Sequence, residues 1–375
     1  MSSISGAILT PSGFLRGSVN LQPDGRIHAV VGHPLDEAAV RDSRGPIVVP
    51  GFIDTHVHGG GGRDMMEGGG AVATIARLHA RHGTTSLLAT TMTAPIADLD
   101  TAFKAVAPHC RARAAGGARI LGVHLEGPYL SAGKLGAQPD YARGFDEAEF
   151  RRLNDIAPIR VVTLAPEVDA NRAAIAMLSA LGVRVQLGHS EGSYEAGLDA
   201  LAKGASGFTH LFNAMSGLHH RAPGLAGAAL AHADYAEIIP DLVHVHPGAI
   251  RAALRCVPRL FCVTDSTAAA GMPDGEYRLG RQAVHKCLGG VRLPDGTLAG
   301  STLTMDEAFR NLVDRLGLSL ADASRRTSTY AADFLGAADR GRIEAGAWGD
   351  LAVFDRNLQL TAVYAEGEAI ALADA

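Results

Sequence analysis

The sequence predicts an α/β protein: a (β/α)8 TIM-type barrel with a small β-sandwich domain formed by both chain termini. Short apolar runs alternate with Ala- and Leu-rich helical stretches from residue 51 to residue 340. That span suits a barrel of this kind, which needs roughly 250 residues. Before and after it, β-rich segments follow one another with Pro and Gly turns between them. With 375 residues, 47% of them hydrophobic, the chain can bury a large core.

The small β-domain is expected to take residues 1–50 and 341–375. Its first strands are predicted at 4–9, 17–21 and 27–31, because Pro-Ser-Gly and Pro-Asp-Gly turns separate these β-rich runs. Residues 341–343 and 351–355 have strand character again. Strands from both ends of the chain are therefore expected to share this domain.

The barrel is expected to take residues 51–340. Its strands are predicted at 51–57, 85–89, 120–125, 161–164, 184–188, 207–209, 235–239 and 260–264. Helices between them are predicted at 71–82, 96–109, 170–181, 194–203 and 247–257. A doubly wound sheet is the alternative, since the order of strands cannot be read from a sequence.

Composition excludes several classes of function. Acidic residues (39) outnumber basic ones (34), which argues against nucleic acid as a partner. No secretory signal is evident in residues 1–17 and no stretch is apolar over the length of a bilayer, so no membrane partner is expected. Arg111, Arg113 and Arg119 lie in Ala- and Gly-rich sequence and are expected to be solvated. The cysteines form no C-x-x-C pair, which is typical of reduced thiols in a cytoplasmic protein: Cys110, Cys256, Cys262 and Cys287.

A His-x-His pattern closes the first predicted barrel strand. His56 and His58 are two residues apart and are followed by four glycines. In a strand, residues i and i+2 point the same way and lie roughly 6–7 Å apart along the backbone. Both imidazoles can therefore reach one ion at the carboxyl end of the barrel. A pair of packed or exposed histidines is the alternative, but the position at a strand end favours metal.

Further acids and imidazoles follow the other predicted strands. Glu126 ends one of them, where a carboxylate is costly to bury unless it is paired or metal-bound. His124, two residues earlier, can instead be a hydrogen-bonded core histidine. His189, His210 and Asp265 each follow a later strand. These ligand types suit Zn²⁺ or a related divalent ion.

The pattern indicates metal-assisted hydrolysis. A divalent ion lowers the pKa of bound water to about 7 and polarises the carbonyl that it faces. A free carboxylate beside that water can take its proton and pass it to a leaving amine. Asp265, the last of the strand-end carboxylates, fits this role. The alternative for Asp265 is a further metal ligand, and it can also be both.

Several segments together resemble the amidohydrolase superfamily, and within it the N-acetylglucosamine-6-phosphate deacetylase family. His-x-His marks only the superfamily, whereas H-L-E-G-P and T-H-L-F-N-A-M mark the deacetylases, and the resemblance covers nearly the whole chain. The matching segments are 50–59, 124–128, 188–190, 209–215, 219–221, 263–266, 300–305 and 341–351.

The resemblance implies hydrolysis of the N-acetyl group of N-acetyl-D-glucosamine 6-phosphate, a step of amino sugar catabolism. Glu126, His189 and His210 would hold the main ion. His56 and His58 would hold a second ion, with Glu126 bridging the two. Zn²⁺ is the expected metal, with Fe²⁺, Co²⁺ or Mn²⁺ as alternatives, and the number of ions, one or two, stays open. Asp265 would be the general base and then the general acid.

The resemblance also implies a set of contacts to an amino sugar phosphate and a homodimer. Arg221 and His244 would hold the phosphate across the dimer interface, and the planar fork of an arginine suits phosphate. The other positions that match substrate contacts are Ala137, Gln138, Asn213, Ala214, Leu298, Ala299 and Gly300.

Two positions depart from the family pattern. Where the family has a histidine that helps polarise the acetyl carbonyl, this chain has Gln138, which can donate a hydrogen bond but cannot become cationic. The usual D-G-x-H segment reads Asp-Leu-Val-His at 241–244, and Leu242 narrows the space beside the phosphate position. Two alternatives therefore stay open. One is a deacetylase of another N-acetylated hexosamine or N-acyl compound. The other is a catalytically silent sugar-phosphate-binding protein.

Overall fold

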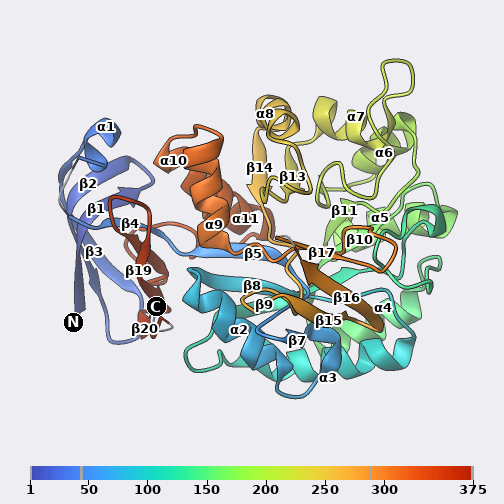
Figure 1. The fold of residues 1–375 in the computed structure, drawn as a ribbon, viewed down its shortest axis with the longest axis horizontal. Coiled ribbons are helices and arrows are strands. Elements are labelled where there is room, and N and C mark those ends of the chain that lie inside the picture. Colours follow the sequence, from blue (N-terminus) through green and yellow to red (C-terminus); the bar gives the residue numbers. More distant parts are fainter. Residues whose placement is uncertain (1, 43–44, 288, 373–375) are drawn as a thin grey trace.

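The computed structural model describes residues 2–42, 45–287 and 289–372. Both termini lie on one side of the molecule, in a β-domain next to a larger α/β body (Figure 1). Residues 1 and 373–375, the outer ends of the predicted β-domain, lie outside the described residues.

Within the described ranges, eight strands run around the α/β body in parallel, which confirms the predicted barrel. The first six form one hydrogen-bonded sheet and the last two pair with each other. Val57, at the end of the first strand, bridges Ser266 beyond the last, and the backbone N–H of Leu211, after β12, bonds the carbonyl of Glu237 on β13. The ring of strands therefore closes, and the doubly wound alternative is wrong. The strands are β5 (Phe52–Val57), β8 (Thr84–Thr90), β9 (Arg119–Glu126), β10 (Ile159–Leu164), β11 (Arg184–Leu187), β12 (Gly207–Phe208), β13 (Tyr235–Ile238) and β14 (Arg259–Cys262).

Helices cover the barrel, and most of the longer ones are amphipathic. The predicted helices correspond to α2 (Ala71–Arg81), α3 (Ile96–Arg111), α5 (Asp169–Ala180), α6 (Tyr194–Ala202) and α8 (Pro247–Cys256). Others were not predicted, such as the largely buried and Gly- and Ala-rich α7, which has no polar face to give a helical period. They are α1 (Glu37–Val40), α4 (Glu147–Ile156), α7 (Gly224–His232), α9 (Met305–Arg310), α10 (Leu320–Ser324) and α11 (Tyr330–Leu335).

The β-domain joins strands from both ends of the chain. Its sheet has the order β20 (Glu368–Ile370), β19 (Leu360–Ala365), β18 (Leu351–Phe354), β4 (Ile47–Pro50), β1 (Ser2–Thr10), β2 (Gly13–Leu21) and β3 (Ile27–Pro34). The strand predicted at 341–343 is wrong. Ile343 is instead fully buried in a cluster with Ile8, Val19 and Val353, so its apolar side chain packs without strand pairing.

Short β-segments lie around the mouth of the barrel. β6 (Gly59–Gly60) pairs with β7 (Arg63–Asp64) directly after the first barrel strand. β15 (Gly275–Leu279), β16 (Gln282–Cys287) and β17 (Gly290–Arg292) form an antiparallel sheet that the sequence did not predict. Its Leu279 and Val284 pack with Met92 and Ala299, which fixes the segment before Gly300 against the barrel.

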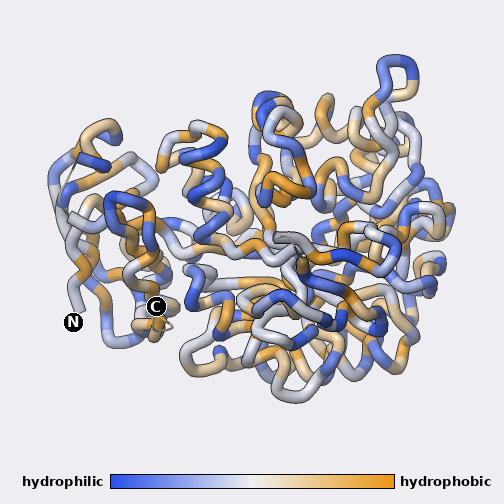
Figure 2. The backbone as a smooth tube through the Cα atoms, in the orientation of Figure 1, coloured by the Kyte–Doolittle hydropathy of each residue, from blue (hydrophilic) through white to orange (hydrophobic). Residues whose placement is uncertain are grey.

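Hydrophobic segments concentrate in the barrel strands, and hydrophilic ones lie on the outer loops and helices (Figure 2). Within the described ranges, no helix is both long enough and apolar enough to cross a membrane.

Candidate active site and metal centre

The residues predicted at strand ends gather at the carboxyl end of the barrel. Glu126 is the last residue of β9, and His58 directly follows β5. His189, His210 and Asp265 follow β11, β12 and β14, with positive φ angles of 47°, 28° and 50°. Such angles are uncommon outside glycine, and strained backbone of this kind clusters at functional sites.

The first ligand group is Glu126, His189 and His210. One carboxylate oxygen, Oε1 of Glu126, lies 3.1 Å from Nε2 of His210 and 3.2 Å from Nε2 of His189. The two Nε2 atoms are 3.1 Å apart. All three side chains are buried, so they form a compact set of one oxygen and two nitrogens.

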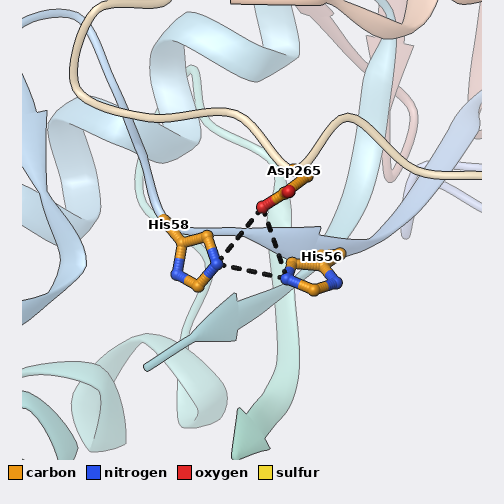
Figure 3. Close-up of side chains that lie close together, drawn as sticks. All are labelled: His56, His58 and Asp265. Atoms are coloured by element: carbon orange, nitrogen blue, oxygen red, sulfur yellow. Dashed lines mark hydrogen bonds and ion pairs between the residues drawn. The ribbon is translucent and has the colours of Figure 1, made fainter. Parts of the chain in front are cut away.

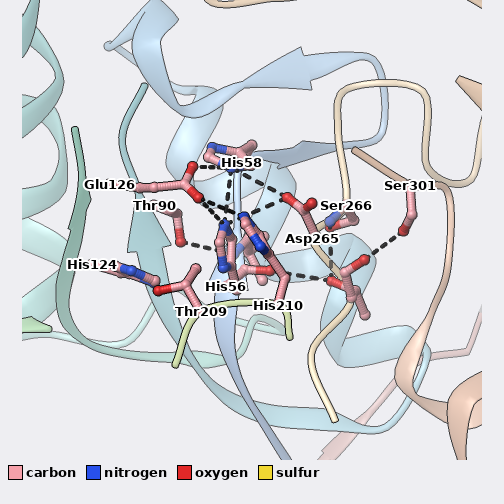
Figure 4. Close-up of polar contacts among 12 residues, drawn as sticks. His56, His58, Thr90, His124, Glu126, Thr209, His210, Asp265, Ser266 and Ser301 are labelled. Carbon is pink, nitrogen blue, oxygen red and sulfur yellow. Dashed lines mark hydrogen bonds and ion pairs between the residues drawn. The ribbon is translucent and has the colours of Figure 1, made fainter. Parts of the chain in front are cut away.

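The second ligand group is His56, His58 and Asp265 (Figure 3). The Nε2 atoms of the two histidines are 3.1 Å apart, and Oδ1 of Asp265 lies 3.3 Å from that of His58 and 3.5 Å from that of His56. Glu126 joins the two groups: its Oε1 lies 3.4 Å from Nε2 of His56, and its Oε2 lies 3.2 Å from Nε2 of His58 (Figure 4).

These donor sets fit a divalent cation. Ligand atoms about 2.0–2.1 Å from a tetrahedral Zn²⁺ lie roughly 3.3 Å from one another. The separations within both groups are close to that value, from 3.1 to 3.5 Å. Neutral imidazole and carboxylate are also ligand types that Zn²⁺ and related ions prefer.

The electrostatics of the cluster favour positive charge in the pocket. Burial alone would lower the pKa of His58, but its bonds to Asp265 and Glu126 raise it to about 9. Burial would raise the pKa of Asp265, but the nearby His56 and His58 lower it to about 2. Burial would also raise the pKa of Glu126, but the surrounding imidazoles hold it well below its usual range. Asp265 and Glu126 therefore remain ionised, and a cation, proton or metal, has to balance them.

His124 lies next to these groups, but its ring nitrogens make hydrogen bonds within the barrel. Its Nδ1 lies 2.9 Å from the carbonyl oxygen of Thr55, and its Nε2 lies 2.7 Å from Oγ1 of Thr163. Both ring nitrogens are thus occupied, and burial lowers its pKa to about 4. His124 also lies close to His56 and Glu237, but its own ring nitrogens are taken by Thr55 and Thr163, and Glu237 contacts Nδ1 of His56.

A pocket of about 190 Å³ opens above the two ligand groups. Predicted substrate contacts line it: Ala137, Gln138, Asn213, Ala214, His244, Leu298 and Gly300. Two others do not. Ala299 is fully buried between its neighbours, and Arg221 lies exposed on a surface loop, where its Nη1 contacts Nε2 of His220 at 2.7 Å.

Gln138 contacts the first ligand group through Glu126. Its Oε1 accepts a hydrogen bond from the backbone N–H of Thr93 at 2.7 Å, which fixes the orientation of the amide. Its Nε2 therefore donates to Oε2 of Glu126, at 2.5 Å. In this arrangement the amide is bound to a ligand carboxylate and does not point freely at a substrate carbonyl.

His244 is oriented by Asp241. The Asp241 Oδ2 lies 2.6 Å from Nδ1 of His244, while its Oδ1 accepts from the backbone N–H groups of Val243 and His244. Burial would lower the pKa of His244, but Asp241 raises it. Leu242, in the place of the family's glycine, has a φ of 65°, so this turn keeps a left-handed residue despite the side chain.

The sequence did not single out Glu237. It lies on β13 and is fully buried, with its Oε2 3.2 Å from Nδ1 of His56. A signal was present: a carboxylate inside the apolar run 235–239 is costly to bury without a partner, the argument that identified Glu126.

The fold and the site define the class of protein: a hydrolase built on a parallel barrel, with a cluster of candidate metal ligands at the carboxyl ends of its strands. The chain belongs to the amidohydrolase family, whose family model matches residues 47–370. This family is metal-dependent, in agreement with the clustered histidines and carboxylates.

Within the family, the chain is similar to sugar-phosphate deacetylases. It is 38% identical to the N-acetylgalactosamine-6-phosphate deacetylase of Escherichia coli O157:H7, over 96% of this chain and 97% of that protein. It is 37% identical to the N-acetylglucosamine-6-phosphate deacetylase of Vibrio furnissii, over 94% and 90%. A solved structure of a variant N-acetyl-D-glucosamine-6-phosphate deacetylase from Mycobacterium smegmatis, in complex with N-acetyl-D-glucosamine-6-phosphate, is 36% identical. It matches with a TM-score of 0.89 over 98% of each chain.

Proposed function

We propose that the protein hydrolyses the N-acetyl group of N-acetyl-D-glucosamine 6-phosphate, giving D-glucosamine 6-phosphate and acetate. One observation carries this proposal: Glu126 lies between two pairs of imidazoles at the mouth of the barrel, with Asp265 beside them. Several similar proteins bear the name of this activity. We assign residues 51–340 as the catalytic domain, and residues 1–50 with 341–375 as a β-domain against its side.

In this proposal, the two ligand groups hold one or two divalent ions. Glu126, His189 and His210 would bind the first ion, and His56 and His58 would bind the second. A divalent ion held there would polarise the acetyl carbonyl and make water a stronger acid. The nitrogen and oxygen donors favour Zn²⁺, with Fe²⁺, Co²⁺ and Mn²⁺ as alternatives.

Asp265 would move the proton. Its low pKa, about 2, means that it is ionised at neutral pH and can accept a proton from the attacking water. Rotation about its side-chain bonds would then bring the same proton to the amide nitrogen. The C–N bond breaks as that nitrogen is protonated, and acetate and the free amine leave.

The phosphate would be held at the far end of the pocket. His244 lines the pocket with its Nδ1 bound to Asp241, which leaves Nε2 for another partner. The exposed Arg221 would reach the phosphate of a second copy, in a homodimer with the site shared across its interface. The four cysteines are unpaired, which supports a reducing, cytoplasmic location.

A second candidate substrate is N-acetyl-D-galactosamine 6-phosphate. The E. coli relative named for that activity is 38% identical, about as similar as those named for the glucosamine. Gln138, bound to Glu126 and Thr93, also removes the free donor that the family resemblance implies beside the acetyl carbonyl.

Acetate release from a small panel of sugars tests the proposal. We expect the highest kcat/KM for N-acetyl-D-glucosamine 6-phosphate, and at least ~100-fold less for the sugar without its phosphate, about 2.8 kcal/mol of discrimination. Elemental analysis of the same sample gives the metal. A higher kcat/KM for the galactosamine epimer would favour the second candidate, and no acetate from any phosphorylated sugar would contradict both.

A further inference from the structure

A buried carboxylate beneath the two ligand groups has no part in the chemistry above. Glu237 projects from β13, and its side chain is fully enclosed. Its Oε1 accepts a hydrogen bond from Oγ1 of Thr55 at 2.7 Å. Its Oε2 lies 3.2 Å from Nδ1 of His56 and 3.4 Å from the backbone N of His210. Glu237 thus contacts both the second ligand group and the backbone of the first.

These contacts determine the tautomer of His56. A carboxylate only accepts hydrogen bonds, so the hydrogen of the His56 imidazole has to sit on Nδ1. The lone pair on Nε2 then faces the cluster, where it lies 3.1 Å from Nε2 of His58 and 3.4 Å from Oε1 of Glu126. This is the tautomer that can bind a metal ion through Nε2.

The four imidazoles differ in how they are held. Nδ1 of His189 lies 2.8 Å from the backbone carbonyl of Lys134, and Nδ1 of His56 contacts the carboxylate of Glu237. Among the described residues, Nδ1 of His58 and Nδ1 of His210 have no partner. Each ligand group therefore contains one oriented imidazole, and only that of the second group is oriented by a charged acceptor.

We propose that Glu237 is a positioning residue that keeps His56 ready for metal binding and so sets the affinity of the second ligand group for its ion. The inference rests on the proposed metal-dependent function, but it concerns metal binding and can be tested without substrate. Acceptors of this kind orient a ligand histidine and raise its basicity, and their loss typically weakens metal affinity 10–100-fold.

The test compares the wild-type chain with Glu237→Gln and Glu237→Leu, by titrating metal-free protein with Co²⁺ in the presence of a competing chelator. The visible spectrum and elemental analysis give the affinity and number of ions. We expect the ion bound by His56 to bind 10–100-fold more weakly in Glu237→Leu than in wild type. In Glu237→Gln, where the amide oxygen can still accept from Nδ1 of His56, the affinity should fall by a smaller factor. The ion of the first group should change by less than about threefold. If Glu237→Leu does not fold, the isosteric Glu237→Gln carries the test.

Thr163→Val is the matched control. It removes a buried hydroxyl that bonds His124 and Thr209 but no imidazole of either ligand group. It should bind both ions as the wild type does. Equal metal affinities in wild type and both Glu237 variants would overturn the proposal. This holds also if the wild type takes up only one ion. An equal loss in Thr163→Val would also overturn it. Acetate release by the wild type tests the proposed function separately.

Discussion

Two clusters of carboxylates in this molecule are paired with different bases. At the barrel mouth, Glu126 and Asp265 are surrounded by imidazoles at 3.1–3.5 Å. Where the barrel meets the β-domain, Glu366 is surrounded by guanidinium groups. Arg119 binds it through Nε and Nη2, at 2.8 and 2.7 Å, and Arg340 contacts Glu366 with one nitrogen and Asp350 with another.

The difference between the bases explains the difference in role. A guanidinium is always charged and only donates, so its ion pairs with carboxylates are complete as they stand. A neutral imidazole offers a lone pair, and two such rings beside a carboxylate leave room for a cation. The mouth is thus a site that a metal completes, and the junction is a structural network that joins two domains.

The largest expected effect is the loss of catalysis in Asp265→Asn. The amide cannot take a proton from water, so kcat/KM for acetate release should fall about 10²–10⁴-fold. The ion of the first ligand group should stay bound, because Glu126, His189 and His210 are untouched. Glu366→Gln is the control from the junction and should retain wild-type activity. An Asp265→Asn variant with a near-normal rate would show that another group moves the proton.

Removal of the metal should have the next largest effect. A ligand at 100 times its Kd stabilises the folded state by about 2.7 kcal/mol, so a chelator should lower the thermal midpoint of the wild type. The shift should be absent in Glu126→Ala, which lacks the carboxylate shared by both ligand groups. It should persist in Glu366→Gln, because the two clusters share no residue. A full chelator shift in Glu126→Ala would mean that the ion binds elsewhere.

Glu366→Gln should destabilise the chain without affecting catalysis. The substitution leaves a neutral amide, in place of a half-buried carboxylate, beside the guanidinium groups of Arg119 and Arg340. This should lower the free energy of unfolding by on the order of 1–3 kcal/mol. Glu368→Gln is the matched control, because Glu368 also contacts an arginine of the junction, Arg113, but is 49% exposed. It should cost less than about 1 kcal/mol. Urea unfolding of both variants measures the difference, and equal costs would remove the special position of Glu366.

The two clusters were not equally predictable from the sequence. Residues of the mouth follow strands, and the alternation of apolar runs with helical stretches locates strand ends without knowledge of the partners. Local spacing alone placed His56 and His58 together. The junction depends on distant partners: Arg119 and Glu366 are 247 residues apart. Arg113 and Arg119 were therefore expected to be solvated, which is wrong, since their side chains are only 10% and 19% exposed.

The orientation of side chains at the barrel mouth could not be predicted from the sequence either. The spacing could suggest that Gln138 lies near the site, but not that its amide is bound between Thr93 and Glu126. Likewise, the role of Glu237 follows from strand order, which brings β13 beside the end of β12. Sequence patterns give the ends of elements, and tertiary contacts decide which atoms meet there.

The last and smallest expected effect is the pH dependence of the unfolding free energy in metal-free protein. Its direction should differ between the two clusters. Burial would raise the pKa of Glu366, but Arg119 and Arg340 outweigh it and lower the pKa from 4.5 to about 2. This carboxylate therefore contributes stability above pH 4.5 that is lost as the pH falls towards 2. His58 has the opposite sign: with a pKa raised from 6.5 to about 9, it contributes stability below pH 6.5 that is lost as the pH rises towards 9.

Unfolding free energies measured across this range, in chelator, for wild type, Glu366→Gln and His58→Gln would separate the two contributions. The gap between wild type and Glu366→Gln should close on the acid side, and the gap between wild type and His58→Gln should close on the alkaline side. Saturation with metal should remove the alkaline dependence, because a bound cation replaces the proton on the imidazole. It should leave the acid side unchanged, since the arginines of the junction keep their charge at every pH of the experiment. If both differences in unfolding free energy vanished at the same end of the pH range, the two clusters would not differ in the way proposed.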